Sequence, residues 1–274
     1  MGKFIEIQEE ELIKMYLSNE YKMSDLCEYF NVSKHKIRKV LLSNNVKSKS
    51  SKKYRYYEDI FEVIDNEEKA YWLGFLYADG YVRERKSSSE MRLKLSIKDI
   101  KHLNEFKKFI SPDELPIFNE LSGNSQCVKL SVNSRKIVKD LINLGCTNRK
   151  SKTIKMPEIN DNLINHFIRG FFDGDGWILI DKNNKPSFGV VSGSKEMLES
   201  INDIIFKKSN IKKNKIYDYT TYYNFMYKSY TDIIKISKFL YNESSIFLVR
   251  KRDKFNEVLS IYQNHKNKNT NRWN

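Results

Sequence analysis

A segment of thirteen residues occurs twice in the sequence, and this repeat constrains the fold more than any other feature. The first copy reads AYWLGFLYADGYV (residues 70–82) and the second reads HFIRGFFDGDGWI (residues 166–178). In both copies a glycine is followed four residues later by a small residue, and then by Asp, Gly, an aromatic residue and a β-branched residue. The two aspartates, Asp79 and Asp175, are 96 positions apart (175 − 79). This spacing predicts two structural repeats of about 100 residues each.

The sequences that follow the two copies also match in their order of predicted elements. Each copy is followed by a strand-like alternation of apolar and polar residues, then a helix, further strands and a final helix. In the first repeat these segments are residues 92–98, 99–110, 127–132 and 136–144. In the second repeat they are residues 188–195, 196–208, 215–228 and 231–242. The pattern predicts an α+β fold made of a pair of αββαββα repeats, at residues 58–157 and 158–264.

The charge of the chain indicates a polyanionic partner. Its 49 Lys and Arg residues exceed its 35 Asp and Glu residues, which gives a formal net charge of +14. Nucleic acid is the leading candidate, because each neutralised phosphate releases counterions and adds affinity that does not depend on sequence. A membrane surface is the alternative, but no apolar run approaches the roughly 18 residues of a spanning helix. The acidic start of the chain also lacks the features of a secretory signal.

The cysteines and histidines limit the metal chemistry. Cys27, Cys127 and Cys146 are far apart and lack Cys-x-x-Cys spacing, so we expect buried thiols in a reducing intracellular compartment rather than disulfides or a zinc site. Four histidines, dispersed along the chain, cannot form a His-rich cluster. A catalytic metal would therefore need oxygen ligands, which favours Mg²⁺-like ions.

The first 46 residues have the pattern of three short helices. Apolar spacing predicts helices over residues 9–18 and 24–30, and Ser33 can cap a third one. A short turn at Asn31 between the last two is the layout of a helix-turn-helix DNA-binding domain, with the third helix as the reader. The outward basic residues of that helix are Lys34, Lys36, Arg38 and Lys39. They are predicted DNA contacts, although a solvated charged face is the alternative.

Two polar segments flank the repeats. Residues 47–57 read KSKSSKKYRYY and predict a basic linker, in which Lys52 and Lys53 are candidate phosphate contacts. A plain solvated linker is nearly as good an interpretation. The polar residues 265–274 predict a disordered basic tail.

Small residues in the repeated segment predict that two helices pack closely. Gly74 and Ala78 share one helix face, as do Gly170 and Gly174, and small residues at this spacing let helix backbones approach each other. The helices would then end with Asp79 and Asp175 side by side. Facing carboxylates at the negative ends of two helix dipoles repel each other, so the arrangement indicates a bound cation.

The segments WLGFLYADG (72–80) and IRGFFDGDG (168–176) resemble the two signature helices of single-chain LAGLIDADG homing endonucleases. The resemblance covers about residues 57–263. It implies a pseudo-twofold molecule in which the signature helices form the interface and the β-sheets saddle DNA. It also implies that Asp79 and Asp175, with Gly80 and Gly176, hold about two or three Mg²⁺ or Mn²⁺ ions, and that the protein is a monomer.

The family also has one basic residue near the active centre in each half. Lys150 and Lys251 occupy those places, and by resemblance they would stabilise charge in the transition state. Ordinary phosphate contacts are the alternative role. The sixth motif position differs between the copies, Tyr77 against Asp173, and we interpret Asp173 as structural because it points away from Asp175 on a helix.

Strand residues are the predicted readers of DNA sequence. In RLKLSIK, the basic residues Arg92, Lys94 and Lys98 share one face of a predicted strand, and Lys195 follows the equivalent strand of the second repeat. The sequence therefore predicts a site-specific endonuclease that cuts double-stranded DNA at a long target. An RNA maturase bound to intron RNA, or a DNA-binding regulator on the same scaffold without cleavage, is the alternative.

Overall fold

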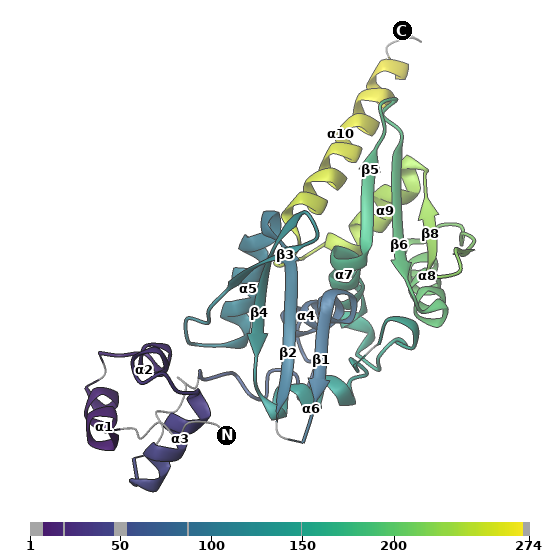
Figure 1. Ribbon diagram of the computed structural model, residues 1–274. Coiled ribbons are helices and arrows are strands. Elements are labelled where there is room, and N and C mark those ends of the chain that lie inside the picture. The colour runs from purple at the N-terminus through teal and green to yellow at the C-terminus, as the bar shows by residue number, and fades with distance from the viewer. Residues whose placement is uncertain (1–7, 19, 47–53, 87, 149, 271–274) are drawn as a thin grey trace. The chain divides into compact units, whose positions relative to one another are not determined.

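The computed structural model describes residues 8–18, 20–46, 54–86, 88–148 and 150–270 (Figure 1). The chain divides into two compact units, with the boundary between residues 53 and 54. The predicted linker residues Lys52 and Lys53 lie outside the described residues. Within the described residues no helix is long and apolar enough to cross a membrane.

The first unit consists of three helices, as predicted. They are α1 (Glu9–Leu17), α2 (Met23–Tyr29) and α3 (Lys34–Ser43), and their core consists of Leu12, Tyr16, Leu26, Ile37, Val40 and Leu41. The Ser33 hydroxyl accepts a hydrogen bond from the Lys36 N–H and so caps α3. Asn31 has a φ of 50°, the left-handed conformation expected in the turn. Helix α2 begins after its N-cap Lys22, whose N–H donates to the Asp25 carboxylate at 2.9 Å.

The first half of the second unit follows the predicted order of elements. Its bounds are α4 (Glu67–Asp79), β1 (Gly80–Glu84), β2 (Ser89–Ser96), η1 (Ile97–Asp99), α5 (Ile100–Ile110), β3 (Phe118–Ser122), β4 (Ser125–Val132), α6 (Arg135–Asn143) and η2 (Lys150–Lys152). The four strands form one antiparallel sheet in the order β1-β2-β4-β3.

The second half repeats this order and adds one helix. Its bounds are η3 (Asp161–Leu163), α7 (Ile164–Asp175), β5 (Gly176–Ile180), β6 (Pro186–Ser192), α8 (Lys195–Ser209), β7 (Tyr217–Asp218), β8 (Tyr223–Tyr227), α9 (Tyr230–Tyr241) and α10 (Val249–Thr270). Its antiparallel sheet has the order β5-β6-β8-β7, which matches that of the first half strand for strand. The predicted pair of αββαββα repeats is confirmed.

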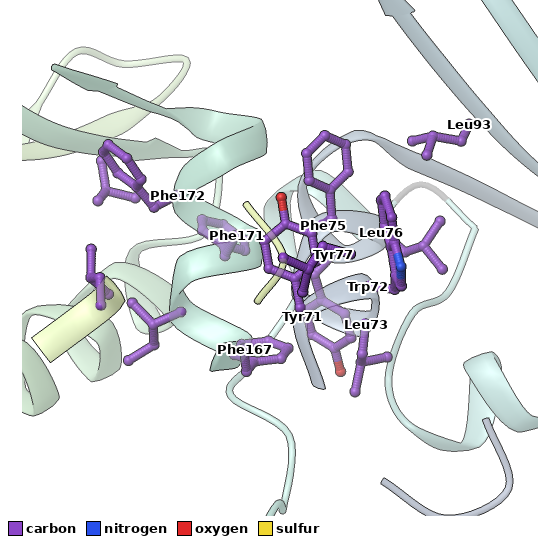
Figure 2. Close-up of a cluster of buried hydrophobic side chains, with 14 of the residues drawn as sticks. Tyr71, Trp72, Leu73, Phe75, Leu76, Tyr77, Leu93, Phe167, Phe171 and Phe172 are labelled. Carbon is purple, nitrogen blue, oxygen red and sulfur yellow. The ribbon is translucent and has the colours of Figure 1, made fainter. Parts of the chain in front are cut away.

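Helices α4 and α7 pack against each other at the centre of the second unit. A Cβ added at Gly74 would lie 2.0 Å from the Phe167 carbonyl oxygen, and one at Gly170 would lie 2.0 Å from that of Tyr71. The predicted glycine interface is therefore confirmed, since only glycine permits this backbone approach. Figure 2 shows the aromatic side chains of both helices around the contact. The rings of Tyr77 and Phe167 meet edge to face there, with their centroids 5.1 Å apart.

Three boundaries differ from the sequence predictions. Residues 54–57 are not linker: Tyr54 and Tyr56 pack against the core of the second unit, and the Tyr57 N–H donates to the Ile110 carbonyl at 3.0 Å. Strand β2 ends at Ser96, so Lys98 lies in the short helix η1 rather than on the strand face. The predicted disordered tail is wrong for residues 265–270, which continue α10, because the His265 ring packs against Tyr230 and holds this part of the helix.

The cysteines are only partly as expected. All three are free, but only Cys146 is buried, whereas Cys27 and Cys127 are half-buried.

Candidate active site

The signature helices bring two carboxylates together at their C-terminal ends. Asp79 is the last residue of α4, and Asp175 is the last residue of α7. The helices remain close at this end, since a Cβ added at Gly174 would lie 2.3 Å from the Ala78 Cβ and 3.3 Å from Asp79 Oδ2. The predicted pairing of Asp79 with the end of α7 is therefore present in the structure.

The two carboxylates disfavour each other's ionised form. Burial raises the pKa of Asp175 to about 7, and the negative charge of Asp79 contributes to this shift, while Lys150 and Lys251 oppose it. The pKa of Asp79 is also raised, chiefly by desolvation of its carboxylate, although the residue as a whole is exposed. A pair of acids with raised pKa values is a place where a cation would be stabilised.

Two buried lysines lie directly behind the carboxylates. Lys150 is 7% exposed and Lys251 is 4% exposed. The Lys251 Nζ donates to three carbonyl oxygens, those of Phe172 at 2.6 Å, Asp173 at 2.8 Å and Gly176 at 2.6 Å. Burial lowers the pKa of Lys251 to about 8, and Asp173 partly offsets this effect. Each ammonium group satisfies carbonyls at the end of a signature helix and adds positive charge at the negative end of its dipole.

Gly80 and Gly176, the other two predicted metal ligands, directly follow the signature helices. Gly80 accepts a hydrogen bond from Lys150 and Gly176 accepts one from Lys251. Because a carbonyl oxygen has two lone pairs, each one can still accept a second partner, and Gly80 and Gly176 stay predicted metal ligands.

The donor set suits a hard divalent ion. Asp79 and Asp175 offer carboxylate oxygens, the ligands that Mg²⁺ binds through one or two residues while it keeps several waters. Within the described parts of the chain, no group of three or more His, Cys, Asp or Glu side chains is arranged to hold a metal. A two-carboxylate site with water and phosphate oxygens completing the coordination is consistent with both observations.

Comparison with known proteins agrees with this architecture. A family model described as a LAGLIDADG-like domain matches residues 162–246. This LAGLIDADG-like domain contains the second signature helix. The curated replication factor C small subunit of Methanocaldococcus jannaschii is 27% identical in an alignment of 177 positions, which covers 56% of this chain but only 8% of that protein.

Two solved structures show the same LAGLIDADG fold. The homing endonuclease I-GzeII in complex with its DNA target is 15% identical, with a TM-score of 0.51 over 75% of this chain and 92% of that one. The homing endonuclease I-SmaMI bound to cleaved DNA is 18% identical, with a TM-score of 0.51 over 76% of this chain and 92% of that one.

One polar pair beside the LAGLIDADG site was not predicted from the sequence. Arg250, at the start of α10 in the second half, donates to both carboxylate oxygens of Asp99 in the first half, at 3.0 and 3.1 Å. The charge of Asp99 raises the pKa of Asp79, and the charge of Arg250 lowers it. The sequence signal that could have drawn attention to Arg250 is an Arg-Lys pair that occurs at residues 149–150 and again at 250–251. Arg149 itself lies outside the described residues.

Asp173 has the structural role that the sequence indicates. It is 1% exposed and accepts hydrogen bonds from the Tyr71 hydroxyl at 2.8 Å, the Tyr241 hydroxyl at 3.1 Å and the Leu248 N–H at 2.7 Å. These contacts tie the second signature helix to the segment that leads into Lys251. Burial nevertheless raises the pKa of Asp173, while Lys251 and the hydrogen bonds oppose that shift.

A buried ion pair joins the two halves next to Asp173. Arg169 is fully buried and donates to Glu67, the first residue of α4, at 2.6 Å. It also donates to the carbonyls of Leu240 and Ile246. Burial opposes ionisation of Glu67, but hydrogen bonds from Ser245 and the charge of Arg169 more than offset this, so the pKa of Glu67 is lowered.

The other predicted DNA contacts lie at separate places. Arg92 and Lys94 project from the outer face of β2, where Glu90 pairs with Arg92 at 2.8 Å and Glu120 pairs with Lys94 at 3.3 Å. Lys195 begins α8 and is exposed. Lys98 follows β2 in the short helix η1. The remaining predicted contacts within the described residues lie on α3, in the first unit; they are Lys34, Lys36, Arg38 and Lys39.

Proposed function

We propose that this protein is a site-specific endonuclease that hydrolyses phosphodiester bonds of double-stranded DNA. The observation that carries the proposal is the pair of aspartates at the ends of two tightly packed signature helices, with a buried lysine behind each helix end. The solved structures of this fold include proteins described as bound to a DNA target and to cleaved DNA.

The metal-binding residues in this proposal are Asp79 and Asp175. A divalent ion such as Mg²⁺ or Mn²⁺, when bound there, would make water more acidic and would neutralise charge on the phosphate. The raised pKa of Asp175, about 7, means that a cation must compete with a proton for this carboxylate near neutral pH.

Lys150 and Lys251 hold the acids in position in this proposal. Their ammonium groups bind the last carbonyls of the helices, so they fix the ends from which Asp79 and Asp175 project. They also bring positive charge close to the place where negative charge develops on the reacting phosphate. Their substitution should therefore lower both stability and the rate of cleavage.

Basic and polar surfaces on each of the two units are available for contacts with a long DNA target. The proposed contacts are the outer faces of the two sheets, Lys98 and Lys195 at their ends, and the basic residues of α3 in the first unit. A monomer suffices, since both acids and both lysines come from one chain. The helix-turn-helix role of residues 1–46 is part of the proposal, and its removal should shorten the protected footprint on DNA.

The deciding experiment is magnesium-dependent cleavage of a randomised double-stranded DNA library. We expect discrete cut sites with the wild-type protein and none with Asp79→Asn or Asp175→Asn, because an amide removes the charge that binds the cation. DNA binding measured in parallel controls for folding and should persist in both variants. Undiminished cutting by either variant contradicts the assigned role, whereas binding without any cutting by the wild type favours the maturase or the regulator.

A further inference from the structure

The outer faces of the two sheets can be compared position by position. In each half, the strand that follows the signature helix starts directly after the aspartate, and the pairing registers of the next two strands correspond. We name the outward residues of the first sheet the charged face: Tyr81, Arg83, Glu90, Arg92, Lys94, Lys129 and Ser131. The corresponding outward residues of the second sheet form the neutral face: Trp177, Leu179, Ser187, Gly189, Val191, Met226 and Asn224.

The neutral face carries no charged residue at any of these seven positions, whereas the charged face carries five. The cross-strand pair Lys94 and Lys129 corresponds to Val191 and Asn224. Arg92 corresponds to Gly189 (Figure 1 shows the parent strands β2 and β6). The two sheets therefore have the same backbone arrangement, but the outer face of the first is charged and that of the second is neutral.

The neutral face is built around a tryptophan that lies on a glycine. A Cβ added at Gly189 would lie 2.2 Å from Trp177 Cζ2, so a residue with a side chain would lift the indole off the sheet. Two residues further along β5, on the same face, Leu179 is 58% exposed. The result is an apolar surface open to a partner.

The neutral face continues directly from the acidic site. Strand β5 begins at Gly176, the residue after Asp175, and Val191 on β6 follows Val190, which pairs with Gly176. Exposed lysines lie toward the end of this face that is remote from Asp175: Lys182 and Lys185 are in the β5–β6 turn, and Lys228 follows β8. This arrangement complements DNA, because the lysines can meet the phosphates while the apolar centre meets the base edges.

One buried amide on this face lacks a partner. Asn224 is 7% exposed, and its Oδ1 accepts no hydrogen bond within the described part of the chain. An amide oxygen can accept from N6 of adenine, the base that pairs with thymine. DNA binding would have to displace the side chains that cover this oxygen.

From these observations we propose that the neutral face reads one half of the DNA target by apolar contact with thymine methyl groups in the major groove. Thymine is the only base with a methyl group there, whereas guanine is read mainly by Arg or Lys, which this face lacks. The half-site on the neutral face should therefore be rich in A·T pairs, and the half-site on the charged face should include guanines. The inference rests on the proposed function and specifies its target.

The test first identifies which half-site of the target the second sheet contacts, and this half-site is called the marked half-site. The Leu179→Arg variant places a guanine-reading group on an exposed position, so library selection with it should introduce a guanine in one half-site only. In the wild-type target, thymines are then replaced by deoxyuridine, which lacks only the methyl group. Binding by Asp175→Asn, in which cutting is removed, is measured for each half-site.

We expect about threefold weaker binding for each contacted methyl group lost from the marked half-site. The same replacement in the other half-site should change binding less. Equal effects in the two half-sites, or a guanine-rich wild-type sequence in the marked half, overturn the inference while leaving endonuclease activity intact. Absence of any DNA binding by the wild type instead refutes the proposed function itself.

Discussion

The two halves of the second unit tether their signature helices through different side chains at the same motif position. Tyr77 and Asp173 occupy the same position of the repeated motif, and each connects its signature helix to the segment before the buried lysine. The Tyr77 hydroxyl donates to the Leu144 carbonyl, whereas the Asp173 carboxylate accepts from the Leu248 N–H. The fold therefore requires a tether at this position but does not require a particular donor or acceptor.

The halves also differ in how they bury charge. Arg169 corresponds to Leu73, 96 positions earlier, and both side chains are fully buried. Leu73 packs among apolar residues, while Arg169 needs Glu67 and two carbonyls to satisfy its donors. The second half consequently depends on a polar network that the first half does without, and its stability should be more sensitive to a single change.

The largest predicted effect comes from that network. Arg169→Met removes the ion-pair partner of Glu67 and the donors to the Leu240 and Ile246 carbonyls, and should reduce the free energy of unfolding by about 2–4 kcal/mol. Leu73→Met at the corresponding position should reduce it by less than about 1.5 kcal/mol. Urea unfolding of both variants measures the difference, and similar losses would show that the two halves do not differ in this way.

The next prediction concerns the glycine contact between the signature helices, to which both halves contribute in the same way. Gly74→Ala and Gly170→Ala each place a methyl group against a backbone carbonyl of the opposite helix, so each should cost about 1–3 kcal/mol. The double variant should cost less than the sum, because one separation of the helices accommodates both methyl groups. Strictly additive losses in urea unfolding would contradict this shared contact.

A smaller effect is expected at the tether of the first half. Tyr77→Phe removes the donor to the Leu144 carbonyl and should cost about 1–2 kcal/mol. Amide hydrogen exchange should become faster around residues 144–148, just before Lys150. Tyr217→Phe, on an exposed tyrosine of β7, is the matched control and should change neither measurement.

The smallest effect concerns pH and exists only in the second half. Burial, together with the charge of Arg169, lowers the pKa of His166 below 6.5, and Ala70 is the corresponding residue in the first half. The folded protein keeps His166 neutral while the unfolded chain takes up a proton as pH falls below about 6.5, so stability should decrease in that direction. His166→Gln should flatten this part of the stability profile, and an unchanged slope would exclude the residue as its source.

The sequence predicted those features that depend on local spacing. The repeat identifies both signature helices, and the glycines at positions 74 and 170 predict their close contact. The resemblance to a known family located Lys150 and Lys251, although the carbonyl contacts of their ammonium groups were not expected. Periodicity could not show that Ser96 ends its strand, since Ile97 and Lys98 continue the alternation.

The missed features depend on contacts between distant segments. Asp99 and Arg250 are 151 residues apart, and nothing local to either residue indicates that they pair. The charge of Arg169 predicts a solvent-exposed side chain. Its burial is possible because it pairs with Glu67, which belongs to the other half. Helix α10 continues past residue 264 because His265 packs on Tyr230, which belongs to α9.

The absence of any residue between signature helix and strand has a further consequence. Asp175 ends α7 and Gly176 begins β5, just as Asp79 ends α4 and Gly80 begins β1. A strand that shifts to accommodate a mismatched base must therefore carry its aspartate with it. Under the proposed endonuclease function, DNA recognition and cleavage share this junction, so a mismatched target would lose both binding affinity and the alignment of the acid with the phosphate.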